Sequence, residues 1–288
     1  MIKDIKYFFL LSRPLNVFIT LIAFALAAFI AKDDALHFFE DLDFWYACIA
    51  LTIITASGYW VNDAFDFKID RENKPKRVIV NAQLSVKKVL SAYFSVIVII
   101  LSASLLLQPF VLFWVNFAAV MLLFLYAWLL KRTTVIGNIV IATLTGLVIY
   151  YAALIYVPRT AVMWMIMFAF EVTFLREVVK DAEDIKGDLK FKLQTLPIKI
   201  GIRATRRVLQ FCYLIFILSC YLPILEAAFR EQALNWLYLL ASIVLVQCPA
   251  AYLLLDLTKA ESTHDFAKQS RYLKVLIFLG MLSVLFLV

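Results

Sequence analysis

The stretch NDAFDFKID, residues 62–70, recurs later in the chain as KDAEDIKGD, residues 180–188. Aligned without gaps, the two copies match at three acidic positions, Asp63/Asp181, Asp66/Asp184 and Asp70/Asp188. On a helix, the spacing i, i+3, i+7 places three side chains within about 60° of arc. Each copy therefore predicts a helix face that carries three carboxylates.

The chain around these acidic stretches is strongly apolar. Of its 288 residues, 64% are hydrophobic and 17% are charged, and its mean hydropathy is +0.89. Soluble domains are far less apolar, whereas helices of roughly 17–25 apolar residues span a bilayer. Nine such runs lie near 15–31, 44–61, 89–107, 111–130, 135–157, 161–179, 208–225, 235–255 and 271–288. We therefore expect an all-α membrane protein with nine transmembrane helices in one bundle.

The distribution of Lys and Arg predicts the orientation, because cytoplasmic loops of membrane proteins accumulate these residues. With the N-terminus inside, 25 of the 28 Lys and Arg residues lie in inner segments, and only Lys32, Arg159 and Arg230 lie in outer ones. We expect a protein of the cytoplasmic membrane with the C-terminus outside and both acidic stretches facing the cytoplasm. Topology and anionic lipid headgroups account for the net charge of +7, so it does not indicate a nucleic-acid partner.

The acidic stretches follow the second and the sixth apolar run. The repeat unit is therefore four spans long, and an even number of spans relates the two copies by an axis along the membrane normal. We expect two four-span pseudo-repeats within a single intramembrane domain, residues 1–288. The inner segments 62–88 and 180–207 are long enough to form short helices that cap the site from the cytoplasm.

Six carboxylates at one mouth of a bundle repel one another and require cations nearby. Mg²⁺ is commonly held by one or two carboxylates together with substrate phosphates and water. Basic residues interleave with the acids, namely Lys74, Lys76, Arg77, Lys131, Arg132, Arg176 and Lys180. Carboxylates, a metal ion and basic side chains form a site for a polyanion whose negative charge grows as it leaves. The alternative, two solvated helix faces with charge pairs, does not explain a gapless repeat at matching spans.

The first stretch fits the pattern N-D-x-x-D-x-x-x-D and the second fits K-D-x-x-D-x-x-G-D, so the chain resembles the UbiA superfamily of intramembrane prenyltransferases. The resemblance covers the whole chain, including NKPKR, residues 73–77, and LKRTTVIGN, residues 130–138. It implies a nine-helix bundle in which the acidic motifs bind a prenyl diphosphate through Mg²⁺, with the prenyl tail in a lateral apolar chamber. We call residues 62–70 motif one and residues 180–188 motif two.

The resemblance also implies roles for individual residues. The implied metal ligands are Asp63, Asp66, Asp70, Asp181, Asp184 and Asp188. The implied catalytic residues are Asp63, Asp66, Asp184 and Lys180. The implied substrate-binding residues are Arg13, Asn62, Lys74, Arg77, Lys131 and Arg132. Two positions depart from the family pattern, because Arg176 stands where a tyrosine is frequent and Val78 stands where a proline usually follows Arg77.

Four further residues are candidates by their own chemistry. Asn16 and Asn138 lie near inner ends of spans, where they can contact a diphosphate or an allylic cation, although Asn also forms hydrogen bonds between helices. The ring face of Tyr126 suits a carbocation, and aromatic packing is the alternative. Glu171 is an acid within a span, which makes it a candidate for the site or an ion-pair partner of Arg176.

REVVKDAEDIKGD, residues 176–188, followed by QTLPIKIG, residues 194–201, is most similar to the geranylgeranylglyceryl phosphate geranylgeranyltransferases. This resemblance implies Mg²⁺-dependent transfer from geranylgeranyl diphosphate to a lipid-like acceptor, whose phosphate Arg176 would bind. A prenyltransferase acting on an aromatic acceptor of quinone biosynthesis is the alternative within the family. A cation or organic-anion transporter is an alternative from another class, but both motifs lie at one face of the membrane and not at its midplane.

Overall fold

The computed structural model describes residues 2–32, 37–75, 78–156 and 159–287. Within these residues the regular structure is helical, and β-pairing is limited to one isolated bridge between Val80 and Leu84. The first six α-helices are α1 (Ile2–Leu11), α2 (Pro14–Ala31), α3 (Leu42–Asn73), α4 (Val86–Leu107), α5 (Phe110–Trp128) and α6 (Ile136–Ile155). They are followed by α7 (Thr160–Glu183), α8 (Ile185–Lys190), α9 (Leu196–Ile200), α10 (Ile202–Ser219), α11 (Leu222–Phe229), α12 (Trp236–Ser242), α13 (Cys248–Leu257) and α14 (Thr263–Val284).

Short helical turns of other types join some of these elements. The 3₁₀ turns are η1 (His37–Glu40), η3 (Leu130–Arg132) and η5 (Leu285–Leu287), and a π-helical turn, η4 (Ile243–Gln247), joins α12 to α13. A sharp turn at Gln108 and Pro109 separates α4 from α5, because proline lacks the N–H that would continue the helix.

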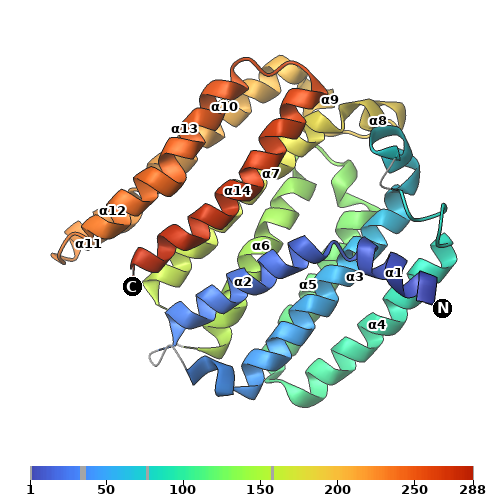
Figure 1. Ribbon diagram of the computed structural model, residues 1–288, viewed down its shortest axis with the longest axis horizontal. Helices are drawn as coiled ribbons and strands as arrows, with labels where there is room; N and C mark the ends of the chain where they lie inside the picture. The colour runs from blue at the N-terminus through green and yellow to red at the C-terminus, as the bar shows by residue number, and fades with distance from the viewer. Residues whose placement is uncertain (1, 33–36, 76–77, 157–158, 288) are drawn as a thin grey trace.

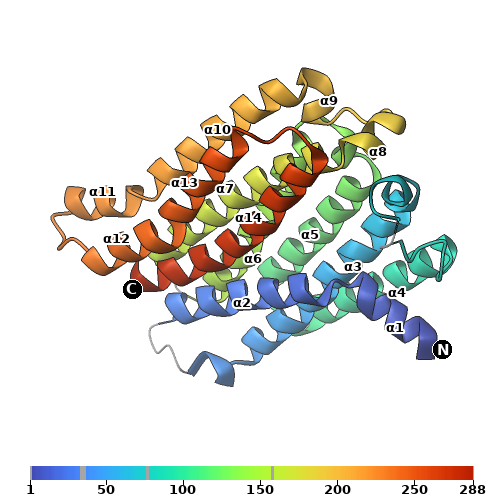
Figure 2. The same ribbon diagram turned by 45° about the horizontal axis from the view of Figure 1, so that its top comes forward.

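The long helices run side by side between two ends of the molecule (Figure 1). The C-terminal ends of α3 and α7 lie with α8 and α9 at one end, which is also the end of the N-terminus, whereas the C-terminus and α11 lie at the other (Figures 1 and 2). Helix α7 packs along α6 and α14, while α3 packs against α4 and α5. Helix α2 packs closely on α6 because its inward face consists largely of alanines, including Ala23, Ala27 and Ala28.

Eight helical segments of the described residues are long and apolar enough to cross a membrane. They are Pro14–Ala31, Leu42–Asn73, Val86–Leu107, Phe110–Trp128, Ile136–Ile155, Ile202–Phe229, Trp236–Leu257 and Thr263–Leu287. The apolar run at 161–179 lies in α7, which is 24 residues long but carries Glu171, Arg176 and Glu177. With these three charges α7 is less apolar than the other eight segments. The chain is an all-α protein with at least eight candidate spans.

The two inner segments differ in their structure. Residues 180–207 contain α8 and α9, which are short helices at the same end of the bundle as motif one. Residues 62–88 instead continue α3 as far as Asn73, so the helix extends past the apolar run at 44–61 by more than three turns. Motif one is therefore carried on a rigid extension of a bundle helix.

Candidate active site

Motif one lies entirely within α3, so Asp63, Asp66 and Asp70 share one face of a continuous helix. The first of them pairs with Arg13, whose Nη2 lies 2.6 Å from Asp63 Oδ1. Arg13 precedes Pro14, the first residue of α2, and adopts a left-handed conformation with φ of 49°. That conformation is costly for a residue other than glycine, and it bends the chain so that the guanidinium also covers the Tyr59 ring, 4.7 Å from its centroid.

Asp66 pairs with Lys131, which lies in the η3 turn between α5 and α6. Both side chains are largely buried, with 8% of Lys131 and 14% of Asp66 exposed. Burial lowers the pKa of Lys131, and the nearby carboxylate of Asp66 opposes this change. The LKRTT stretch therefore places one buried cation, Lys131, beside motif one. Arg132 is exposed, and its carbonyl oxygen accepts a hydrogen bond from the Gln194 N–H.

Motif two does not lie on one helix, because α7 ends at Glu183 and α8 begins at Ile185. Asp184 occupies the break between them. The expected single face of three carboxylates is therefore interrupted in motif two. Asp188 is buried on α8, and this burial, together with nearby Asp184, raises the pKa of Asp188 to about 7.

Direct contacts hold the two motifs together. The Gly187 N–H donates to Asn73 Oδ1 at 2.7 Å, and a Cβ on Gly187 would lie only 2.4 Å from Asn73 Nδ2. Lys74 Nζ lies 2.7 Å from Asp184 Oδ1 and 3.2 Å from Glu183 Oε1. A side chain at position 187 would therefore force the Asn73 side chain to shift and break its hydrogen bond. The NKPKR stretch provides the residues that bridge the motifs.

The remaining polar groups of motif two face neighbouring helices. Asn138 on α6 donates to Asp181 Oδ2 at 2.8 Å. Glu177, buried one turn before Lys180, accepts from Arg176 Nη1 at 2.8 Å and lies 3.4 Å from Lys180 Nζ. Asn138 therefore orients the Asp181 carboxylate. Glu177 holds Arg176 and Lys180 on the part of α7 that faces the bundle interior.

A chamber of about 250 Å³ extends from these cations into the bundle. Its polar end includes Arg13, Asn16, Asn62, Tyr126 and Lys180. Its walls are mainly apolar and come from α2, α3, α5, α6, α7 and α14. Such a combination of an apolar cavity and a few convergent polar groups is typical of a ligand site.

A hydrogen-bonded group of Ser104, Gln108, Asn116 and Tyr151 lies at the opposite end of the chamber. Asn116 Nδ2 donates to Ser104 Oγ at 2.8 Å, to Gln108 Oε1 at 3.0 Å and to the Tyr151 hydroxyl at 3.1 Å. Asn116 and Tyr151 also line the chamber. The group lies near the turn between α4 and α5 and satisfies its polar atoms internally, so it limits the chamber in this direction.

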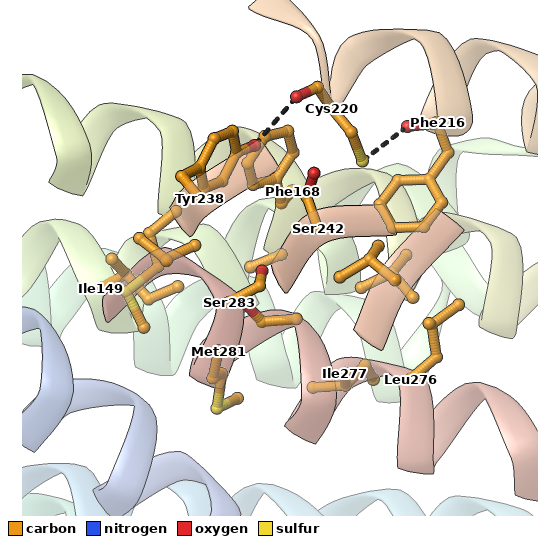
Figure 3. Close-up of a pocket in the computed structure, with 16 residues that line it drawn as sticks. Ile149, Phe168, Phe216, Cys220, Tyr238, Ser242, Leu276, Ile277, Met281 and Ser283 are labelled. Carbon is orange, nitrogen blue, oxygen red and sulfur yellow. Dashed lines mark hydrogen bonds between the residues drawn. The ribbon is translucent and has the colours of Figure 1, made fainter. Parts of the chain in front are cut away.

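A second cavity of about 20 Å³ lies behind the α14 wall of the chamber (Figure 3). It is lined mainly by apolar side chains, and Ile277 and Met281 line both cavities. Tyr238 closes it from α12 and donates its hydroxyl to the Cys220 carbonyl oxygen at 2.9 Å. The small volume and the apolar lining make this cavity a packing defect beside the chamber.

Some residues expected at the site lie elsewhere. The carboxylate of Glu171 accepts from Ser219 Oγ of α10 at 2.7 Å, and Glu171 does not line the chamber. The expected alternative of a pair between Glu171 and Arg176 is wrong, since Arg176 pairs with Glu177. Lys76 and Arg77 lie outside the described residues.

The sequence reasoning missed several residues that the structure brings to the chamber, namely Tyr59, Thr173, Glu177 and Lys274. Tyr59 and Glu177 precede Asp63 and Lys180 by about one helical turn, so helical periodicity from the motifs would have found them. Lys274 lies in the last apolar run, where a single basic residue is itself a signal.

Comparison with known proteins agrees with this architecture. Residues 16–282 match the model of the UbiA prenyltransferase family. The chain is 30% identical over 275 residues to digeranylgeranylglyceryl phosphate synthase of Methanosphaera stadtmanae, covering 94% of this chain and 95% of that one. It is 33% identical over 243 residues to the synthase of the same name from Metallosphaera sedula, covering 82% and 81% of the two chains.

Solved structures share the fold. One, described as digeranylgeranylglyceryl phosphate synthase in membranes, has a TM-score of 0.74 and 24% identity and covers 99% of this chain and 98% of its own. A UbiA homologue from Archaeoglobus fulgidus, solved with GPP and Mg²⁺, has a TM-score of 0.67 and 14% identity and covers 96% and 99% of the two chains. Because the family model matches nearly the whole length, this chain belongs to the UbiA prenyltransferase family.

Proposed function

We propose that this protein transfers a geranylgeranyl group from geranylgeranyl diphosphate to geranylgeranylglyceryl phosphate, in a reaction that depends on Mg²⁺. The observation that carries the proposal is the apolar chamber that begins beside the two motifs, at Asn62 and Lys180, and is also lined by Arg13 and Arg176. The names of the curated relatives support the choice of acceptor. This assignment also answers why the chain contains its acidic stretch twice, since a diphosphate needs ligands from two sides.

Magnesium fits the residues that are present. No three His, Cys, Asp or Glu residues of the described chain form a ready-made metal site. Mg²⁺ does not require one, because one or two carboxylates, substrate phosphates and water complete its shell. Asn62 Oδ1 is buried and has no hydrogen-bond partner among the described residues, so it is available to a bound ligand at this end of the chamber. The aspartates of both motifs are the residues that would hold Mg²⁺, which when bound neutralises charge on the departing diphosphate.

The chain's own residues have distinct roles in this proposal. Arg13, Lys74 and Lys131, which now pair with motif aspartates, would bind the diphosphate oxygens, and Lys180 would contact them from α7. The C–O bond to the prenyl group breaks, and its electron pair leaves with the diphosphate. The Tyr126 ring in the chamber wall stabilises the allylic carbocation. The acceptor hydroxyl then attacks this carbon and forms an ether bond, and the diphosphate that has left takes up the hydroxyl proton.

We also propose the full topology of the chain. Helix α7 is the ninth span, and its charged residues are tolerated because several of them face the chamber and neighbouring helices instead of lipid. Residues 1–288 form one domain of two four-span pseudo-repeats, in which α3 and α7 are the helices that end in a motif. The excess of Lys and Arg at the motif end supports a cytoplasmic site in the cytoplasmic membrane, with the N-terminus inside and the C-terminus outside.

The function is tested with purified protein, geranylgeranyl diphosphate and a panel of acceptors. We expect diphosphate release that requires both Mg²⁺ and geranylgeranylglyceryl phosphate. Prenylation of hydroxybenzoate or dihydroxynaphthoate without activity on the glyceryl phosphate ether would assign the protein to aromatic acceptors. Substrate uptake into vesicles without any release of diphosphate would instead indicate a transporter.

A further inference from the structure

One wall of the chamber carries polar groups that the diphosphate site does not use. Thr173 and Arg176 are three residues apart on α7, and both line the chamber. Thr173 Oγ1 and Arg176 Nε are buried and have no hydrogen-bond partner among the described residues. Buried donors without partners destabilise a fold, so two of them on one wall indicate a ligand that accepts hydrogen bonds.

Lys274 lines the same chamber from α14, which packs along α7. Lys274, Ile277 and Met281 are spaced i, i+3, i+7, and all three line the chamber, so they form one face of α14. Lys274 is nearer the end of α14 that lies with the motifs. Ile277 and Met281, which Figure 3 labels, are nearer the C-terminal end of α14. This face matches a lipid with an anionic head and an apolar tail.

The chamber lining carries more basic than acidic side chains. Four basic residues, Arg13, Arg176, Lys180 and Lys274, and one acidic residue, Glu177, line it. Arg13 is bound to Asp63 of motif one, and Lys180 belongs to motif two. Arg176 and Lys274 are the two basic residues of the lining that the diphosphate site described above does not use. A basic residue within a membrane span is a candidate for a functional site, and Lys274 lies at the chamber.

We propose that Lys274 and Thr173, together with Arg176, form the subsite for the phosphate of the acceptor. This inference rests on the proposed function, since it assumes an acceptor that carries a phosphate monoester. The phosphate lies between α7 and α14, the isoprenoid chain of the acceptor follows Ile277 and Met281, and the glycerol hydroxyl points toward the reacting carbon near Tyr126. The subsite explains how two anionic substrates occupy one chamber without sharing their cations.

The test compares Lys274→Met, Lys274→Arg and Thr173→Val with the wild-type protein in neutral detergent. Each is assayed with geranylgeranyl diphosphate and two acceptors, geranylgeranylglyceryl phosphate and the same glyceryl ether without phosphate. Lys268→Met is the matched control, because Lys268 lies on the same helix and does not line the chamber. The melting temperature of each variant identifies any loss of folding.

We expect Lys274→Met to raise the KM for the phosphate acceptor at least about tenfold, the effect of one charged hydrogen bond. The KM for geranylgeranyl diphosphate and the rate with the phosphate-free ether should stay within about twofold. Lys274→Arg should restore most of the acceptor affinity, and Thr173→Val should raise the acceptor KM by a smaller factor. Lys268→Met should behave as the wild type.

Three results would overturn the subsite. The first is an unchanged acceptor KM in Lys274→Met, and the second is an equal loss with both acceptors or with geranylgeranyl diphosphate. The third is a KM change that appears only in vesicles of anionic lipid, which would mean that Lys274 binds bilayer headgroups. A wild-type protein that ignores geranylgeranylglyceryl phosphate would instead refute the proposed function itself, before any variant is compared.

Discussion

Asp66 and Asp70 lie one turn apart on α3 but differ in their surroundings. Asp66 forms a largely buried pair with Lys131, whereas Asp70 forms no salt bridge with another residue of the described chain. Breaking a buried ion pair by removing one partner costs about 3–5 kcal/mol, because the remaining charge is left without compensation. A measurement of the free energy of unfolding can therefore distinguish the role of Asp66 from that of Asp70, although both belong to motif one.

We predict that Asp66→Asn and Asp70→Asn both reduce Mg²⁺-dependent turnover at least about a hundredfold. Only Asp66→Asn should lower the stability of the ligand-free protein, by about 3 kcal/mol, because Lys131 loses its partner. Turnover and thermal unfolding in detergent measure the two effects. Wild-type turnover in either variant would refute the two-motif site, and a large loss of stability in Asp70→Asn would contradict the described pairing.

Arg176 departs from the family pattern and belongs to the acceptor subsite that we propose. Its Nη1 is bound by Glu177, but its Nε has no partner among the described residues, and its fork of donors suits a phosphate. We predict that Arg176→Gln raises the acceptor KM by the equivalent of about 2 kcal/mol or more and leaves the geranylgeranyl diphosphate KM nearly unchanged. Steady-state kinetics with each substrate varied provide the measurement.

The control for Arg176 is Arg203→Gln, an equivalent change at an exposed position on α10. It should alter neither constant. If Arg176→Gln weakens both substrates to the same extent, Arg176 belongs to the diphosphate site, and the acceptor assignment of this residue is wrong.

At the scale of the elements, the junction between α3 and α8 positions the two motifs. Gly187 on α8 lies so close to the side chain of Asn73, the last residue of α3, that a methyl group at 187 would force this side chain to move. We predict that Gly187→Ala displaces α8, lowers stability by about 1–3 kcal/mol and raises the KM for geranylgeranyl diphosphate, because Lys74 and Asp184 move apart. Thermal unfolding and kinetics measure both effects.

Gly280→Ala provides the matched control for this junction. Gly280 lies on α14, and a Cβ there meets no atom within 4 Å. Alanine is the better helix former by about 0.5–1 kcal/mol, so Gly280→Ala should leave activity unchanged and stability equal or slightly higher. A Gly187→Ala variant that behaves like Gly280→Ala would show that the junction tolerates a side chain.

At the scale of the whole molecule, the sidedness of the loops depends on whether α7 crosses the membrane. Ala82 and Gln232 are exposed, the first before α4 and the second between α11 and α12. Five spans separate them if α7 crosses and four if it does not. We predict that, in a protein without its four native cysteines, Ala82→Cys reacts with an impermeant reagent only from the cytoplasm and Gln232→Cys only from outside. Labelling from the same side would mean that α7 does not span the membrane.

The sequence by itself determined the membrane class, the helical architecture, the two acidic motifs and their family. These properties depend on nearby residues or on their periodicity. Long apolar runs indicate membrane spans, and the i, i+3, i+7 spacing of motif one indicates one face of a helix, independently of how that helix packs. The same local rule failed at motif two, since α7 ends at Glu183 and α8 starts anew. Nothing in the spacing of KDAEDIKGD records the approach of Asn73 to Gly187.

Only the tertiary structure decided which charges meet. Lys131 reaches Asp66 across 65 positions of sequence, Lys74 reaches Asp184 across 110, and Glu171 turns to α10 and away from the chamber. Lys274 could be recognised from sequence as a basic residue in an apolar run, but its place in the same chamber as Thr173 and Arg176 depends on how α14 packs along α7. Pairing between distant residues is set by helix packing, which sequence periodicity within one helix does not encode.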